Sequence, residues 1–173
     1  ISMVRAISDR LKQPGHLIIE AGTGIGKSFA YLIPFLMRQP LAKPIVVSTA
    51  TIALQEQLLH KDIPQISKSL DRPIVAVLAK GRSNYICEDR LEKARSHAAS
   101  LAESPGADEQ LAHWANLARE IHPLSRSDLP HPISPELWPH VCSEVGICSS
   151  TQCKKRNCSF YAARQKMKNA DIL

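Results

Sequence analysis

The stretch Glu20-Ala-Gly-Thr-Gly-Ile-Gly-Lys-Ser28 decides how the first half of the chain is interpreted. It follows an apolar run, His16 to Glu20, and opens a run with helical periodicity, Lys27 to Arg38. A glycine-rich turn between a strand and a helix that ends in Gly-Lys-Ser is typical of a phosphate-binding loop. The glycines permit a tight turn whose backbone N–H groups point at phosphate oxygens, and the helix N-terminus adds its positive dipole end.

Two side chains of this loop carry the predicted chemistry. Lys27 would meet the β- and γ-phosphates of a nucleoside triphosphate, and the Ser28 hydroxyl would ligate Mg²⁺. These two are the predicted catalytic residues, and ATP and Mg²⁺ are the predicted cofactors. The predicted cofactor site comprises Ala21, Gly22, Thr23, Gly24, Ile25, Gly26, Lys27 and Ser28.

Short apolar runs alternate with helical stretches through residues 1–79. Besides the run before the phosphate loop, Pro44 to Ser48 and Pro73 to Leu78 are typical of buried strands, whereas Ile52 to His60 has a helical pattern. This order predicts an α/β fold in which a parallel sheet is joined by right-handed crossovers.

The pattern changes after residue 87. Residues 88–121 are rich in Ala, Leu and charged side chains and are interrupted by Ser104-Pro-Gly106, which predicts two helices around a turn. Five of the twelve prolines lie between Pro123 and Pro139, so an irregular connection is expected there. Asp108-Glu109 is the one acidic pair that resembles the Mg²⁺-binding acid of a phosphate-loop ATPase. No apolar strand precedes this pair, so we expect it to begin a solvated helix, with the ATPase acid outside these residues.

Composition limits the class of protein. With 173 residues, 44% of them hydrophobic, the chain can bury a core. Lys and Arg outnumber Asp and Glu by 22 to 16, which favours a polyanionic partner. The longest apolar stretch, Phe29 to Met37, contains a proline and no leader pattern is visible, so a cytoplasmic protein is expected. Five cysteines in such a chain favour metal ligation or redox chemistry over a disulfide framework.

A second motif, Val46 to Gln57, places small hydroxylated residues between a predicted strand and a helix. One interpretation is that Thr49 or Thr51 caps the helix. Together with the phosphate loop, the string resembles motif Ia of superfamily 2 helicases. That resemblance implies that Thr49, Thr51 and Gln55 lie along the backbone of single-stranded DNA.

The resemblance narrows at Lys80-Gly-Arg-Ser-Asn-Tyr-Ile-Cys87, which is similar to the segment of DinG and XPD helicases that carries the first cysteine of an iron–sulfur cluster. It extends over nearly the whole chain from about Leu17. Further stretches similar to the bacterial DinG branch are Trp138-Pro-His-Val141, Cys148-x4-Cys153-x4-Cys158, Phe160-Tyr-Ala-Ala-Arg164 and Asn169-Ala-Asp-Ile172.

The resemblance implies the N-terminal part of an iron–sulfur helicase. The expected fold is a partial RecA-like P-loop domain with a parallel sheet, plus a small helical and loop-rich iron–sulfur domain inserted into it. In this arrangement residues 1–79 begin motor domain 1, residues 80–164 form the iron–sulfur domain and residues 165–173 return into motor domain 1.

The implied function is ATP-dependent 5′ to 3′ translocation on single-stranded DNA in repair or replication. The expected partner is single-stranded DNA or a forked or R-loop nucleic acid, bound by a monomer, and the isolated fragment is expected to be inactive. An alternative is a non-catalytic nucleotide- and nucleic-acid-binding module with a structural Cys₄ zinc site. A P-loop kinase or a cluster-assembly ATPase has less support, because neither needs the motif Ia string or a basic cysteine loop.

The cysteines permit two metal sites. The resemblance implies a [4Fe–4S] cluster held by Cys87, Cys148, Cys153 and Cys158, with Cys142 left over. On spacing alone, Cys142-x5-Cys148-x4-Cys153-x4-Cys158 also fits a structural Cys₄ zinc site. The sequence does not separate iron from zinc, nor Cys87 from Cys142 as the fourth ligand.

Positive charge gathers around the cysteines. Residues 148–173 hold six Lys or Arg and one acid. Such a run is either a solvated face or a nucleic-acid contact. Because Phe160 and Tyr161 adjoin it and aromatic rings stack on bases, the predicted DNA contacts include Lys154, Lys155 and Arg156.

Overall fold

The internal packing of the chain divides it into two units. Unit 1 comprises Ile1–Leu78 and Asn169–Leu173, and unit 2 comprises Ala79–Lys168. The computed structural model describes residues 2–38, 44–97, 106–130, 133–146, 151, 153 and 158–173. The assignment of residues 1–79, 80–164 and 165–173 to motor and iron–sulfur domains stays a prediction.

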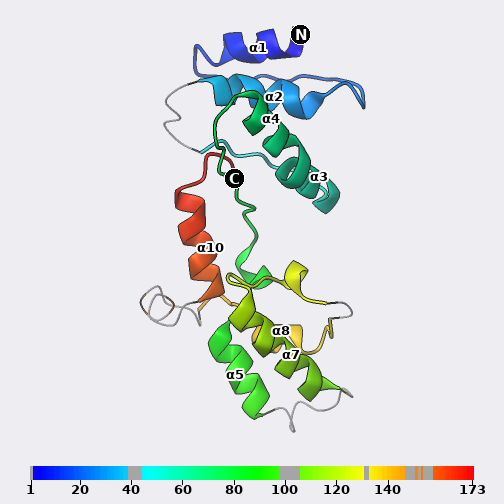
Figure 1. The fold of residues 1–173 in the computed structure, drawn as a ribbon, viewed down its shortest axis with the longest axis vertical. Helices are drawn as coiled ribbons and strands as arrows, with labels where there is room; N and C mark the ends of the chain where they lie inside the picture. Colours follow the sequence, from blue (N-terminus) through cyan, green and yellow to red (C-terminus); the bar gives the residue numbers. More distant parts are fainter. Residues whose placement is uncertain are drawn as a thin grey trace. The chain divides into compact units, whose positions relative to one another are not determined.

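Unit 1 is built mainly from helices (Figure 1). Its core consists of buried side chains on α2, on the run from η1 through α4, and on the C-terminal segment. These are Leu32, Leu36, Leu58, Ile63, Ile66 and Ile172. The elements are α1 (Ser2–Arg10), α2 (Lys27–Met37), α3 (Ile52–Gln57), the π-helical turn η1 (Leu58–Asp62) and α4 (Ile63–Ser69).

Helix α2 begins where the sequence predicts. Gly26 precedes it in the left-handed conformation, with φ of 79°, and the helix ends at Met37, one residue before the predicted end. Leu32 and Leu36 are four residues apart, so they lie on one face of the helix and both are buried. The predicted helix Ile52 to His60 is longer than expected, because the chain continues through η1 and α4 without a break.

The predicted parallel sheet is wrong. Among the described residues of unit 1, pairing is limited to two isolated parallel bridges, Ile45 with Ile172 and Ala76 with Ile172. The segment His16 to Glu20 is in no named strand, and the Ile18 side chain is 96% exposed. A sheet needs ladders of successive backbone hydrogen bonds and a layer covering its apolar face. The apolar runs supply strand-like composition, and Ile45, Val47 and Ala76 pack against the unit 1 core, but their described pairing stops at single bridges and builds no sheet.

The two bridges share the C-terminal segment Asp171–Leu173. On one side the backbone N–H of Ile45 donates to the Asp171 carbonyl at 2.8 Å, and that of Leu173 donates back to Ile45 at 2.8 Å. On the other side Asp171 donates to the Val75 carbonyl at 2.8 Å, and Val77 donates to Ile172 at 2.9 Å. The last residues therefore lie between two extended segments that are far apart in sequence.

Unit 2 has a larger apolar core under its helices. Trp114 and Trp138 meet edge to face with ring centroids 6.3 Å apart, and Leu111, Leu124 and Val141 are fully buried around them. The elements are η2 (Arg82–Asn84), α5 (Glu88–Ser96), α7 (Ala107–Glu120), η3 (Arg126–Asp128), α8 (Trp138–Val141) and α10 (Ser159–Lys168).

Helices are confirmed within residues 88–121 as α5 and α7, whereas Ser104 and Pro105 of the predicted turn lie outside the described residues. Asp108 and Glu109 lie exposed in the first turn of α7, after Gly106 with φ of 82°, as expected for a solvated helix start. Within the part of the chain that the structure describes, every helix is too short or too polar to cross a lipid bilayer.

Candidate functional site

The phosphate-loop residues form a closed turn at the start of α2. The Lys27 ammonium donates to the Ala21 carbonyl at 2.9 Å, so the first and seventh residues of the motif are joined. Every α-helix leaves its first N–H groups without an intrahelical partner, and here those groups belong to the end of the loop. The loop thus places a cation and helix N–H groups together, as an anion site requires.

Two glycines of the loop have backbone conformations that other residues rarely adopt. Gly24 has φ of 76° and Gly26 has φ of 79°. A Cβ atom added at Gly22, Gly24 or Gly26 would meet no atom within 4 Å, so the backbone is bare at all three positions. The loop therefore offers exposed backbone to a ligand, and its shape depends on glycine at positions 24 and 26.

Ser28 contacts a tyrosine one turn further along α2. Burial raises the pKa of Tyr31, and the hydrogen bond between Tyr31 and Ser28 partly offsets this by lowering the pKa. The phenol keeps its proton at neutral pH, because its ordinary pKa of about 10 is raised. The predicted Mg²⁺-ligating hydroxyl is therefore held by a neutral partner.

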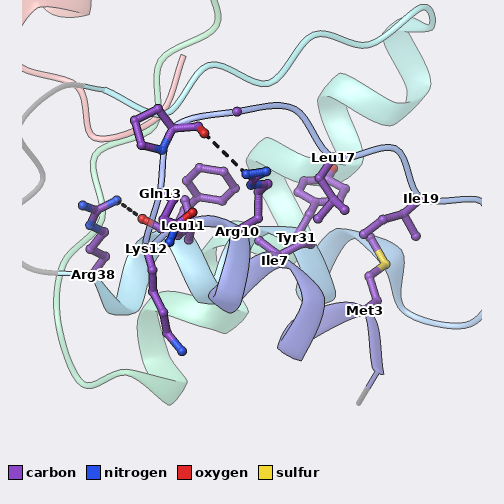
Figure 2. A pocket seen from close by; sticks show the side chains of 13 residues that line it. Met3, Ile7, Arg10, Leu11, Lys12, Gln13, Leu17, Ile19, Tyr31 and Arg38 are labelled. Carbon is purple, nitrogen blue, oxygen red and sulfur yellow. Dashed lines mark hydrogen bonds between the residues drawn. The ribbon is translucent and has the colours of Figure 1, made fainter.

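A cavity of about 600 Å³ lies in unit 1, between α1, the loop that follows it and α2 (Figure 2). The Arg10 guanidinium donates to the Pro14 carbonyl at 3.4 Å, and Arg38 donates to the Leu11 carbonyl at 2.8 Å. Most other lining side chains are apolar, including Leu17 and Tyr31. The two arginines thus fasten the loop that leads toward the phosphate site.

The motif Ia residues surround the start of α3. Thr51 caps this helix, because its hydroxyl accepts from the Leu54 N–H at 3.4 Å, and Thr49 donates to the Thr51 carbonyl at 3.2 Å. Gln55 is half-buried on the same helix. The capping interpretation is confirmed for Thr51, and the DNA contacts of Thr49, Thr51 and Gln55 stay a prediction.

The segment Lys80–Cys87 is anchored to other parts of unit 2. Lys80 donates to the Ser125 and Ser127 hydroxyls at 2.7 and 2.5 Å. Arg82 lies over the Phe160 ring, 4.2 Å from its centroid. The Tyr85 ring meets the same phenylalanine edge to face at 5.8 Å. Phe160 therefore packs against protein groups, which leaves it less available for the base stacking that the sequence suggested.

Cys87 and Cys142 belong to paired segments but face opposite ways. Ile86 and Cys142 form an antiparallel bridge, flanked by hydrogen bonds from Cys87 N–H to the Val141 carbonyl and from Ser143 N–H to the Tyr85 carbonyl, each 2.8 Å. Paired residues share a face, and adjacent residues alternate. Cys142 therefore lies with Ile86 in the apolar core, whereas Cys87 lies on the other face.

A contact that the sequence did not predict joins the neighbours of Cys87 and Cys158. Glu88 accepts from the Ser159 backbone N–H at 3.1 Å and from its hydroxyl at 2.5 Å. Cys158 in turn donates its N–H to the Cys153 carbonyl at 3.2 Å. The only sequence signal is that an acid follows one cysteine and a serine follows the other.

Several predicted site residues fall outside the described part of the chain. They are Cys148, Lys154, Lys155 and Arg156. Among the residues that are described, no three His, Cys, Asp or Glu side chains are grouped so as to hold a metal ion. The described residues thus bring part of the predicted cysteine set into one unit without completing a site.

Comparison with known proteins supplies the family. The chain is 33% identical over 177 residues to the ATP-dependent DNA helicase YoaA of Escherichia coli, covering 99% of this chain and 26% of that protein. It is 32% identical over 176 residues to the ATP-dependent DNA helicase DinG of Photobacterium profundum, covering 91% of this chain and 24% of that one. The chain belongs to the DinG-type helicase family.

The DinG-type chain spans about a quarter of the length of these curated relatives. Over a shorter stretch of 95 residues it is 46% identical to the helicase DinG of Mycobacterium tuberculosis, covering 51% of this chain and 14% of that protein. No protein-family profile matches the chain. The DinG-type resemblance predicted from the phosphate loop and the Lys80–Cys87 segment is confirmed.

The glycine conformations of this DinG-type loop generate a prediction. Gly26→Ala should weaken MgATP binding about tenfold, because a left-handed backbone costs an L-residue roughly 1–2 kcal/mol. Gly22→Ala is the matched control, since Gly22 is in the same loop but outside the left-handed region. Isothermal titration of the 173-residue chain compares the two variants. Unchanged affinity in Gly26→Ala contradicts the prediction.

Proposed function

We propose that the chain is part of an ATP-dependent DNA helicase that moves 5′ to 3′ on single-stranded DNA, in DNA repair or replication in the cytoplasm. The observation that carries the proposal is the phosphate loop closed by Lys27, in a chain whose relatives over nearly its whole length are named ATP-dependent DNA helicases. We propose forked and R-loop nucleic acids as further substrates. We also propose that the protein acts as a monomer.

In this proposal the loop residues Ala21 to Ser28 bind the nucleotide. Backbone N–H groups and the N-terminus of α2 receive the phosphates, Lys27 meets the β- and γ-phosphates, and Ser28 orients toward Mg²⁺. The Mg²⁺ ion supplies charge neutralisation at the phosphates when it is bound. Since Asp108 and Glu109 begin a solvated helix, they have no part in this chemistry, and the isolated chain should turn over little ATP.

Lys27→Ala tests the nucleotide site. In the full-length protein this variant should lose DNA-stimulated ATPase activity by about 100-fold or more, because it removes a cation that faces the transferred phosphate. Lys12→Ala is the control, since Lys12 is an exposed lysine of the same unit whose side chain pairs with Asp9 at 2.7 Å. A Lys27→Ala protein with normal DNA-stimulated turnover would exclude the proposed site.

We further propose that Cys87, Cys148, Cys153 and Cys158 hold a [4Fe–4S] cluster. Thiolates are the donors that such clusters take, and the Glu88–Ser159 contact supports the pairing of Cys87 with Cys158 in one site. The core position of Cys142 favours Cys87 as the fourth ligand. When bound, the cluster cross-links distant segments of the chain, so its proposed role is structural.

Two single substitutions test the ligand set. After anaerobic purification, Cys87→Ser should lose most of its iron and acid-labile sulfide, because it removes a thiolate ligand. Cys142→Ser should retain both, since Cys142 lies in the apolar core and contacts the Pro139 carbonyl at 3.9 Å. Metal and sulfide analysis of both proteins gives the answer. A colourless protein that contains zinc and no sulfide rejects the cluster.

Two groups of residues are proposed to contact single-stranded DNA. Thr49, Thr51 and Gln55 supply hydroxyl and amide groups at the start of α3, suited to a sugar-phosphate backbone. Lys154, Lys155 and Arg156 supply positive charge in the cysteine loop. The excess of basic residues in this part of the sequence supports the second group.

Charge reversal tests the basic group. The triple variant Lys154→Glu, Lys155→Glu and Arg156→Glu, in the intact protein, should bind single-stranded DNA more weakly and with a flatter dependence on salt, because fewer counterions are released. The control replaces Lys93, an exposed lysine of α5, with Glu. Fluorescence anisotropy across a salt titration measures both effects. Equal affinity and equal slope for the triple variant and the wild type defeat the proposal.

A further inference from the structure

A single carboxylate joins the N-terminal ends of two helices in unit 2. Glu88 is the first residue of α5, and its side chain accepts hydrogen bonds from Ser159, the first residue of α10. The Ser159 backbone N–H lies 3.1 and 3.3 Å from the two Glu88 carboxylate oxygens. The Ser159 hydroxyl donates to one of them at 2.5 Å. An acidic group is favourable at the N-terminus of a helix, and Glu88 serves both helices.

The same contact includes a third segment. The Leu124 backbone N–H donates to the Ser159 hydroxyl at 3.0 Å. Ser159 and Leu124 are both fully buried, so water cannot replace these bonds. The hydroxyl therefore donates to Glu88 and accepts from Leu124, and Glu88 is its only described acceptor outside its own helix. These hydrogen bonds fix how the segments that carry Glu88, Leu124 and Ser159 are oriented relative to one another.

Each of the two helix ends carries a cysteine directly before it. Cys87 is the N-cap residue of α5, and Cys158 is the residue that precedes α10. Cys158 is also tied to Cys153 through its backbone N–H. We propose that Glu88 is a positioning residue that holds Cys87 against Cys158 before any metal binds. The use of this pair as cluster ligands rests on the proposed function, whereas the positioning itself does not.

The test measures the distance between the two thiols in the metal-free chain. Cys142, Cys148 and Cys153 are replaced by Ser in all 173-residue proteins, so that two thiols remain. Dibromobimane, a short reagent that becomes fluorescent when it bridges two nearby thiols, reports the rate of cross-linking. Glu88→Ala should slow this rate by about tenfold or more, because charged hydrogen bonds to buried groups are lost. Glu88→Gln keeps the shape of the side chain and one oxygen acceptor, so its cross-linking rate should lie between those of the parent and Glu88→Ala.

Two controls separate positioning from general stability. Glu92→Ala removes an exposed acid of the same helix, whose partner is Arg95 at 3.3 Å, and should cross-link at the parent rate. Leu111→Ala destabilises the core of unit 2 but removes none of the hydrogen-bonding groups of the contact, and it should also keep the parent rate while folded. Circular dichroism verifies folding of each variant. Where Glu88→Ala does not fold, a slowed but folded Glu88→Gln supports the proposal.

The proposal is overturned if Glu88→Ala or a folded Glu88→Gln cross-links as fast as the parent, or if Leu111→Ala slows equally. It is also overturned if the parent cross-links no faster in buffer than in denaturant. Iron and sulfide analysis of the wild-type chain is a separate readout. Cross-linking that depends on Glu88 in a protein that binds no iron rejects the cluster and retains the positioning role.

Discussion

Backbone pairing between Val75–Val77 and Asp171–Ile172 is the constraint on which the rest of the structure depends. The chain leaves unit 1 after Leu78 and returns at Asn169, so these hydrogen bonds close a loop that contains all of unit 2. Closing a long loop costs entropy that grows only slowly with its length. The Asp171 carboxylate adds a bond from the Val75 N–H at 2.8 Å, which strengthens the closure. Unit 1 therefore includes residues from both ends of the sequence.

Local patterns predicted the helices and the phosphate loop, because both depend on residues close in sequence. The start of α2, the two helices α5 and α7 and the cap by Thr51 follow from glycine, apolar spacing and hydroxyl placement. The prediction of a sheet was wrong because a sheet depends on residues that are far apart in sequence. A strand needs partners supplied by other segments, and composition does not reveal whether those partners pair over one residue or over many.

The proposed cysteine site also combines features that local sequence predicts with features that long-range pairing determines. Spacing alone grouped Cys142 with the three later cysteines, whereas the family resemblance implied Cys87, so the fourth ligand stayed open. The antiparallel bridge at Ile86 separates them by face, which only backbone pairing determines. The contact between Glu88 and Ser159 spans 71 residues, so no local rule could predict it. Sequence thus indicates which residue types carry the chemistry, and long-range pairing determines how they are oriented.

The bond between the Lys27 ammonium and the Ala21 carbonyl has a consequence for the energetics of ligand entry. A lysine side chain that is ordered only on binding loses up to roughly 2 kcal/mol of rotamer entropy. Here the side chain is already ordered, so on phosphate binding the ammonium exchanges the Ala21 carbonyl oxygen for a phosphate oxygen. The loop thus meets part of the entropic cost of recognition during folding, and the Ala21 carbonyl becomes a competitor that the phosphate must displace from the ammonium.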